Sequence, residues 1–370
     1  MVHARPIRVL HICNVYFPHG SVESIIDAIV AKSDYGFLHY VATLERPSVH
    51  VLPWSEAVQK YGHSIRKICI ESRYNAFKVL SRLRRLCREH EVDVLHCHMG
   101  WSLVIGRAAS LMLGMPLVIT FHSECLRYNA AVRWSLKLLP RRNCTYIGVS
   151  NAVADQWARW LKYPVWLIGN PLKLSVCSDS QLQQRSANHV RLVVVARLTP
   201  VKRIDLAIRL VKALVDRGAC PQLTIVGAGS ELVRLKKLAN SLGITRHLEF
   251  VGFQSDVTQW LDDADYFVLS SDYEGFCMAA IEAMARGALV VTHQLPALAD
   301  YAEDNATAIV TRCRDVESWA ERILELQETP ERLLTMKHSA RQVVAEKFRV
   351  ESVVKRYEAV YRNSAHRAAT

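Results

Sequence analysis

The feature that most constrains the fold is the repeated alternation of short, β-rich apolar runs with helical patterns. Apolar runs lie at 7–13, 92–98, 116–121, 146–150, 190–196, 223–230, 247–253, 264–271 and 289–292. Helical patterns follow several of them, at 23–31, 101–113, 205–217, 231–242 and 278–285. Such alternation predicts parallel sheets with helices on both faces, joined by right-handed crossovers.

A polar segment without apolar periodicity, 172–189, interrupts this alternation and reads as a linker. The 370 residues are enough for about two domains. We therefore predict an α/β protein of two Rossmann-like doubly wound domains, 1–171 and 190–349. An apolar stripe at helical spacing predicts a last helix within 350–370 that packs back across the domain junction, with residues 363–370 frayed.

Composition is that of an ordinary globular protein, with 50% hydrophobic and 22% charged residues. The ten cysteines form no CxxC pair, and Cys13, Cys97 and Cys144 sit in apolar runs. This pattern favours buried, reduced thiols in a cytosolic protein over disulfides or a zinc site. No signal peptide is visible, and the apolar run 103–121 is broken by Arg107, Gly114 and Pro116, so we expect no membrane span.

Charge is unevenly distributed along the chain. Residues 1–170 carry a net charge of +10, while residues 171–370 carry +2. Within the basic half, 75–90 reads as an amphipathic helix with Phe77 and Leu83 on its apolar side and basic residues opposite. Two interpretations remain open, an anionic membrane surface as partner or a basic face that is simply solvated.

The segment 273–287 carries the strongest functional pattern. It places Glu274 on a loop after a buried strand and Glu282 about two turns into the helix that ends at Gly287. A helix that begins near Cys277 directs unpaired N–H groups at an anion, and two carboxylates flank that position. A diphosphate with a sugar on each side, as in a nucleotide-sugar, fits this arrangement. Two solvated acids on a helix are the alternative.

Two further strand ends carry residues suited to phosphate. Arg197 and Lys202 flank the turn after the strand 190–196, where they hold a diphosphate or are solvated loop cations. Gly227 and Gly229 form a Gly-x-Gly turn after the next strand, which alone is a weak signal. Gly20, in the loop after the first strand, has either a phosphate-binding role or a simple turn role.

Histidines mark the strand ends of the N-terminal half. His96 and His98 alternate along one strand, and we reject a metal site there because no further ligand is evident nearby. His98 and His122 both lie at strand ends, where a pocket of a doubly wound sheet is expected. A single histidine is more often structural, so a functional role for His122 requires other support.

Together, Arg197, Lys202, Gly227, Gly229, Glu274 and Glu282 resemble the pattern of family-4 retaining glycosyltransferases of the GT-B fold. The resemblance covers essentially the whole chain and is strongest over 190–292. It implies two Rossmann-like domains that face each other across a cleft, with a C-terminal helix crossing back to the first domain.

The resemblance also implies roles for single residues. Arg197 and Lys202 match the cations that neutralise the donor diphosphate, Glu282 the acid that binds ribose, and Glu274 the acid that contacts the transferred sugar. His122 resembles the histidine near the reacting centre. Gly20, Gly227, Phe253, Phe276, Cys277 and Met278 complete the expected donor site. Two positions depart from the family pattern: Cys277 stands at a usual glycine, and Ser21 replaces a frequent second glycine.

We therefore expect a hexosyltransferase that moves a sugar, with retention, from a nucleoside-diphosphate sugar to a glycan or glycolipid acceptor. Polysaccharide or lipopolysaccharide synthesis at the cytoplasmic membrane face is the expected setting. We expect no nucleic-acid partner and no metal, because no Asp-x-Asp pair stands at a donor-site strand end. The alternatives are a sugar-nucleotide epimerase of similar build and a non-catalytic partner subunit.

Overall fold

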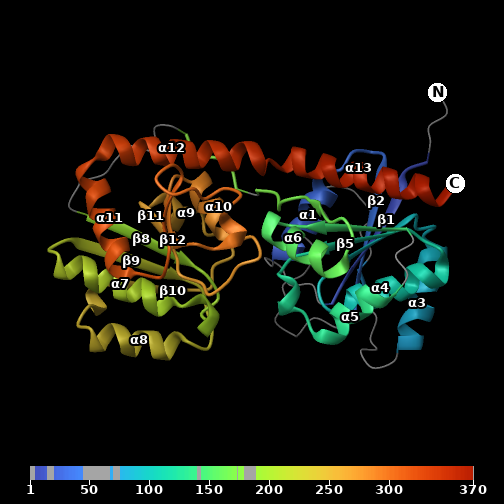
Figure 1. Ribbon diagram of the computed structural model, residues 1–370, viewed down its shortest axis with the longest axis horizontal. Helices are drawn as coiled ribbons and strands as arrows, with labels where there is room; N and C mark the ends of the chain where they lie inside the picture. The colour runs from blue at the N-terminus through green and yellow to red at the C-terminus, as the bar shows by residue number, and fades with distance from the viewer. Residues whose placement is uncertain are drawn as a thin grey trace. The chain divides into compact units, whose positions relative to one another are not determined.

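The structure is a computed structural model that describes residues 5–14, 21–44, 67–69, 76–139, 143–172, 174–178 and 189–369. The chain divides into two compact units (Figure 1). The first unit comprises Met1–Pro171 and Val350–Thr370, and the second comprises Leu172–Arg349. Within the described residues, none of the helices combines the length and apolar character that crossing a membrane requires.

The first unit contains a seven-stranded parallel sheet in the order β3-β2-β1-β4-β5-β6-β7. Its strands are β1 (Ile7–Cys13), β2 (Phe37–Thr43), β3 (Lys67–Cys69), β4 (Val94–His98), β5 (Leu117–Phe121), β6 (Cys144–Gly148) and β7 (Trp166–Leu167). Its α-helices include α1 (Ser21–Lys32), α3 (Ala76–Glu89), α4 (Trp101–Leu113), α5 (Ala130–Leu138), α6 (Asn151–Leu161) and α13 (Val350–Ala369). The strand order reverses between β1 and β4.

Helices α1 and α13 cover one face of this sheet and form an apolar core with it. Val353, Val354, Tyr357 and Tyr361 of α13 are buried against strand residues that include Val9, Val94 and Val118. The apolar stripe that the sequence shows therefore fixes the helix to the first unit. The prediction that 363–370 is frayed is wrong for 363–369, because α13 continues to Ala369 and Ser364 is buried, while residue 370 lies outside the described residues.

The second unit contains a six-stranded parallel sheet in the order β10-β9-β8-β11-β12-β13. Its strands are β8 (His189–Val195), β9 (Cys220–Val226), β10 (Leu248–Gly252), β11 (Tyr266–Leu269), β12 (Leu289–His293) and β13 (Ala308–Thr311). Its α-helices include α7 (Ile204–Asp216), α8 (Leu232–Ser241), α9 (Thr258–Asp262), α10 (Met278–Ala285), α11 (Val316–Glu328) and α12 (Pro330–Lys347). This strand order is that of dinucleotide-binding Rossmann folds, and it reverses between β8 and β11.

Both sheets thus confirm the predicted α/β fold of two doubly wound Rossmann-like units. In the second unit α7, α8 and α11 share one core with the sheet, while α10 packs with α12 (Figure 1). Part of the predicted linker also packs there, since the Leu172 amide donates to the Phe348 carbonyl and the Cys177 amide to the Ala285 carbonyl. Cys13, Cys97 and Cys144 are buried thiols outside any disulfide, as predicted.

The amphipathic pattern of α3 is only partly as predicted. Val79, Leu83, Leu86 and Cys87 form its buried side, but Phe77 is 87% exposed, so its assignment to the apolar side is wrong. The cause is the register of the helix, in which Val79 rather than Phe77 precedes Leu83 on the packed face. Elements β2, β3, β13, α5, α6 and α11 were not predicted.

Candidate functional site

In the second unit the loops after β8 and β11 are bonded directly to each other. The Asp272 amide donates to the Val201 carbonyl at 2.8 Å, and the Ser270 hydroxyl donates to the Lys202 carbonyl at 3.0 Å. These loops leave the carboxyl ends of the two strands between which the strand order reverses. In open α/β sheets this is the position where ligands bind.

An ion pair connects the side chains of these two loops. The Lys202 Nζ donates to Glu274 Oε1 at 2.7 Å, and the two side chains are only 21% and 10% exposed. The Ser271 hydroxyl donates to the same carboxylate oxygen at 2.7 Å. Burial, the largest single effect, acts to lower the pKa of the Lys202 ammonium group, but the charge and hydrogen bond of Glu274 together with the Cys277 thiol outweigh it, so the pKa is raised. Lys202 is therefore a charged group held in place inside the strand-end site.

Electrostatic effects show that other expected residues lie near this pair. The positive charge of Arg197, an exposed side chain, acts against protonation of Lys202 and so opposes the rise in its pKa. Burial raises the pKa of the Cys277 thiol, and the carboxylates of Glu274 and Glu282 add to that rise. The structure thus brings Arg197, Lys202, Glu274, Cys277 and Glu282 into one neighbourhood of the second unit.

The Gly-x-Gly turn packs tightly against the loop after β8. A Cβ at Gly227 would lie 1.9 Å from the Ala196 carbonyl oxygen, and one at Gly229 would lie 2.3 Å from the Leu198 carbonyl oxygen. Gly227 also has φ +146° and donates its amide to the Gly252 carbonyl at 2.8 Å. Phe253 follows Gly252 and is 63% exposed. Glycine at 227 therefore lets the ends of β8, β9 and β10 approach one another.

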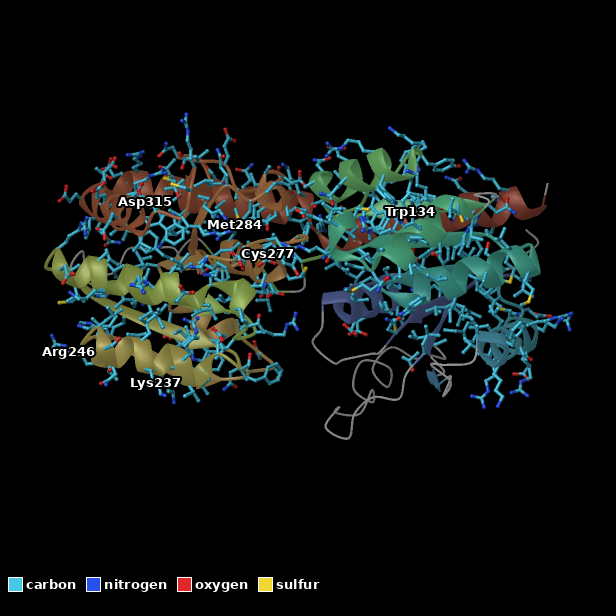
Figure 2. The ribbon with its side chains drawn as sticks, turned by 60° about the horizontal axis from the view of Figure 1, so that its bottom comes forward. Trp134, Lys237, Arg246, Cys277, Met284 and Asp315 are labelled. Atoms are coloured by element: carbon cyan, nitrogen blue, oxygen red, sulfur yellow. The ribbon has the colours of Figure 1, made fainter. Side chains whose placement is uncertain are left out.

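The segment from Phe276 to Met278 forms the start of α10, where Figure 2 labels Cys277 and Met284. Cys277 adopts φ +64° and ψ +81°, a left-handed conformation that suits glycine. Cysteine at this position therefore keeps a glycine-like backbone. The Tyr301 hydroxyl supports the turn by donating to the Phe276 carbonyl at 2.5 Å.

Sequence reasoning missed both Ser271 and Tyr301. The adjacent Ser270-Ser271 pair at the end of β11 is the one signal for Ser271, since hydroxyls at a strand end often face a ligand site. Nothing in the sequence indicates Tyr301, which reaches the turn from beyond β12. Gly20 lies outside the described residues, so its predicted role stays a prediction.

His122 lies in the first unit, directly after β5. It is 8% exposed, its amide donates to the Tyr128 hydroxyl at 3.3 Å, and burial lowers the pKa of its imidazole to about 3. The ring is therefore neutral and acts as a hydrogen-bonding group at physiological pH.

More histidines surround His122 than the sequence analysis expected. His11 lies on β1 opposite His96 of β4, and the ring nitrogens of His11, His96 and His98 lie within 4.8 Å of one another. The premise that no further ligand lies near His96 and His98 is therefore wrong, because strand pairing places His11 beside them. Both His96 nitrogens are engaged, Nδ1 with the Tyr361 hydroxyl and Nε2 with the Thr120 hydroxyl, each at 2.8 Å. A metal ion would have to displace these bonds.

Comparisons with known proteins agree with this architecture. Residues 180–343 match the family model described as Glycosyl transferases group 1, and residues 15–176 match that of Glycosyltransferase Family 4. A crystal structure of Anabaena Alr3699/HepE in complex with UDP and glucose has the same fold. It is 17% identical with a TM-score of 0.79, and the likeness covers 96% of this chain and 99% of that one.

Two curated relatives have informative names. The N-acetyl-alpha-D-glucosaminyl L-malate synthase of Bacillus anthracis is 28% identical over 76% of this chain and 77% of its own. The amylovoran biosynthesis glycosyltransferase AmsK of Erwinia amylovora is 32% identical over 40% of this chain, and the match spans 39% of that protein.

The fold and its strand-end site define a GT-B protein with two Rossmann-like units. The chain belongs to the family-4-like glycosyltransferases, because the two family models together match most of its length. This membership favours a transferase over the epimerase alternative.

A first prediction concerns the strained backbone at Cys277. We expect Cys277→Gly to raise the free energy of unfolding of the second unit by about 1 kcal/mol, because glycine accepts a positive φ without steric cost. Urea denaturation measures the change, with Cys220→Gly on an exposed strand residue as control. A decrease in stability at Cys277→Gly would show that the left-handed turn is not strained.

A second prediction concerns acid stability. Burial lowers the pKa of His11, His96, His98 and His122, so below pH 6.5 the unfolded chain binds protons that the folded unit does not. The first unit should therefore lose stability as the pH falls below 6.5, and His122, whose pKa is about 3, should contribute up to about 1.4 kcal/mol per pH unit to this loss. Hydrogen exchange of β1 and β4 amides measures this loss, with β8 and β11 as the internal reference. Equal losses in both units contradict the prediction.

Proposed function

We propose that this glycosyltransferase moves a hexosyl group, with retention of anomeric configuration, from a nucleoside-diphosphate sugar to an acceptor hydroxyl. The observation that carries the proposal is the Lys202–Glu274 ion pair at the β8/β11 switch point, beside the start of α10. Its neighbourhood supplies cations for a diphosphate and carboxylates for sugar hydroxyls within a single unit.

Arg197, Lys202 and the amides of 276–278 are proposed to bind the diphosphate. An arginine gives forked contacts to phosphate oxygens, a lysine gives a point charge, and a helix start adds oriented N–H groups. Lys202 is already charged and held in place by Glu274, so little reorganisation is needed when an anion arrives. Charge that develops on the departing phosphate is where such preorganised groups lower a barrier most.

The two carboxylates are proposed to bind the sugars on either side. Glu274, held by the Ser271 hydroxyl, accepts hydrogen bonds from the transferred hexose. Glu282, half-buried on α10, accepts them from the ribose hydroxyls. The exposed ring of Phe253 at the end of β10 offers a surface for the base, and Gly227 keeps the adjacent loop close. Gly20 is proposed to face the diphosphate from the first unit.

The proposed chemistry needs no nucleophile on the protein. The departing phosphate oxygen takes the proton of the acceptor hydroxyl, and His122 contacts the sugar near the reacting centre as a neutral ring. Arg197 and Lys202 provide the stabilising charge, and the proposal assigns no step to a metal ion. NMR of the product anomer decides the stereochemistry, and an inverted product contradicts the retaining mechanism.

The crystallised complex of the Anabaena protein with UDP and glucose supports a nucleotide-sugar donor. The name of AmsK, an amylovoran biosynthesis glycosyltransferase, supports a polysaccharide or related glycan precursor as the acceptor. We place the acceptor in the basic first unit and the reaction at the cytoplasmic face of a membrane.

The donor site predicts how UDP changes thermal stability. UDP at 100 times its dissociation constant should stabilise the second unit by about 2.7 kcal/mol.

Lys202→Met and Arg197→Met should each weaken UDP binding about tenfold or more, because each removes a charge-assisted hydrogen bond. Glu274→Gln should change UDP affinity much less than Lys202→Met does, because the amide oxygen can still hold Lys202 and UDP carries no hexose for this side chain to bind. Calorimetric titration measures all three.

The matched control is Lys237→Met, which removes the same charge from the exposed surface of α8, apart from Cys277 in Figure 2. The donor-site proposal fails if the Lys237 and Lys202 variants lose affinity equally. It also fails if Glu274→Gln weakens UDP binding as strongly as Lys202→Met does.

Helix α3 is the proposed contact with an anionic membrane. Lys78, Arg82, Arg84, Arg85 and Arg88 are all exposed on it, and each cation near an anionic surface contributes about 1 kcal/mol. We expect flotation with phosphatidylcholine vesicles only when phosphatidylglycerol is included. The triple change of Arg82, Arg84 and Arg85 to Ala should abolish flotation. The control changes the exposed Arg209, Lys237 and Arg246 to Ala, which removes equal charge and should leave flotation intact. Binding that is independent of lipid charge refutes the proposal.

A further inference from the structure

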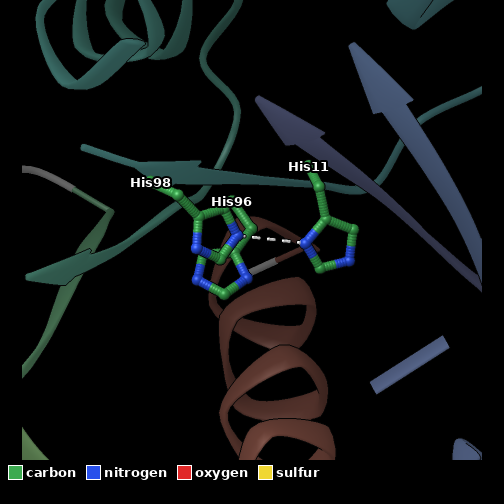
Figure 3. Close-up of side chains that lie close together, drawn as sticks. All are labelled: His11, His96 and His98. Atoms are coloured by element: carbon green, nitrogen blue, oxygen red, sulfur yellow. Dashed lines mark hydrogen bonds between the residues drawn. The ribbon is translucent and has the colours of Figure 1, made fainter. Parts of the chain in front are cut away.

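A row of hydrogen-bonded histidines crosses four adjacent strands of the first unit and ends at His122. His39 of β2 bonds His11 of β1 (Nδ1 to Nε2, 3.1 Å). His11 bonds His98 of β4 (Nδ1 to Nε2, 3.2 Å), the bond that Figure 3 marks. His98 bonds His122 after β5 (Nδ1 to Nε2, 3.3 Å). At the other end, His39 Nε2 lies 3.0 Å from the Ser33 hydroxyl. We call His39, His11, His98 and His122 the histidine chain.

The strand register explains why these rings meet. His11 pairs with His96, Cys13 with His98, and Val9 with His39, so side chains of the same parity share one face of the sheet. On that face the strands begin with apolar residues such as Val9 and Val94, and histidines follow towards their carboxyl ends. The histidine chain therefore runs obliquely across this face, from the middle of β2 to His98 and His122 at the carboxyl ends of β4 and β5, where a ligand is expected.

Burial limits the protonation states of the rings. Each of the four is at most 8% exposed, and burial lowers the pKa of His11, His98 and His122. A neutral imidazole has one N–H and one acceptor nitrogen, so each ring can donate at one end only. If His11 donates to His98, then His98 must donate to His122. If instead His122 donates to His98, then His98 must donate to His11. Neighbouring tautomers are therefore coupled along the row.

The two ends of the histidine chain differ in their hydrogen-bond partners. Nδ1 of His122 is buried and has no hydrogen-bond partner among the residues that the structure describes. At the far end, the half-buried Ser33 hydroxyl can either donate or accept. When the rings donate towards His122, the Nε2 of His122 accepts and its Nδ1 carries the proton. When the rings donate towards Ser33, the Nε2 of His122 donates and its Nδ1 is an acceptor.

We propose that His39, His11 and His98 are positioning residues that set the tautomer of His122, and thereby decide whether its Nδ1 offers a donor or an acceptor to a sugar hydroxyl. The contact with sugar rests on the proposed function, while the coupling of tautomers does not. His96 stands outside the histidine chain, because its nitrogens bond Tyr361 and Thr120.

The test is NMR of ring nitrogens in the full chain, free of ligand and labelled with ¹⁵N-histidine, which distinguishes N–H from acceptor nitrogens. Ser33→Ala removes the far hydroxyl, and His11→Phe interrupts the row. Each leaves a ring Nε2 without its partner, and a buried N–H without an acceptor costs more than an unpaired acceptor nitrogen. Each should therefore raise the share of His122 that carries its proton on Nδ1, about three- to tenfold, the factor that corresponds to one hydrogen bond. Ser33 is half-buried and lies at the end of α1, so its variant should fold even if the His11 variant does not.

Tyr361→Phe is the matched control. It removes a buried hydroxyl that bonds His96 in the same layer but lies outside the histidine chain, so the His122 ratio should not change. An unchanged ratio in Ser33→Ala overturns the proposal, and so does an equal change in Tyr361→Phe. The measurement uses no nucleotide. Failure of UDP to bind would therefore refute the donor-site proposal alone.

Discussion

The ion pair between Lys202 and Glu274 is the interaction on which the strand-end site of the second unit depends. It joins the loops after β8 and β11, whose strands are neighbours although the two residues lie 72 positions apart. The pair orients a charged ammonium group and a carboxylate at the same point of the sheet. Ser271 holds the carboxylate and backbone bonds at Asp272 and Ser270 hold the loops, so the pair is supported on several sides.

The two units place different chemistry at equivalent positions of similar sheets. The second unit gathers cations, carboxylates and a strained helix start at its switch point, a combination suited to a charged and hydroxylated ligand. The first unit gathers neutral imidazoles, which donate or accept hydrogen bonds but carry no charge when buried. Tyr357 and Tyr361 of α13 complete this polar layer, which links the last helix of the chain to the strand ends.

Much of the fold could be predicted from the sequence, and the reasons are local. The predicted bounds of α4 and α10 are those observed, because Gly114 and Gly287 adopt positive φ just beyond them. Short strands such as β13 were not predicted, because so short an apolar run is too weak a pattern to identify a strand. Phe77 was misplaced because an apolar residue at the first turn of a helix can face either side.

The sequence indicated which residues belong to the candidate site, but not which of them contact one another. Arg197, Lys202 and Glu274 were found from their strand-end positions and Glu282 from its place on the following helix, whereas the bond between Lys202 and Glu274 depends on the order of strands in the sheet. The histidine chain depends on register between β2, β1 and β4, which no local pattern reveals. The left-handed backbone of Cys277 is likewise set by its surroundings rather than by its own preference.

A crystal structure of the full chain with UDP tests the central claim most directly. The account predicts phosphate oxygens within hydrogen-bonding distance of Lys202 Nζ and the Arg197 guanidinium group, and next to the amides at the start of α10. It also predicts that Glu282 contacts the ribose. A diphosphate bound elsewhere, with Lys202 still paired only to Glu274, would contradict the account.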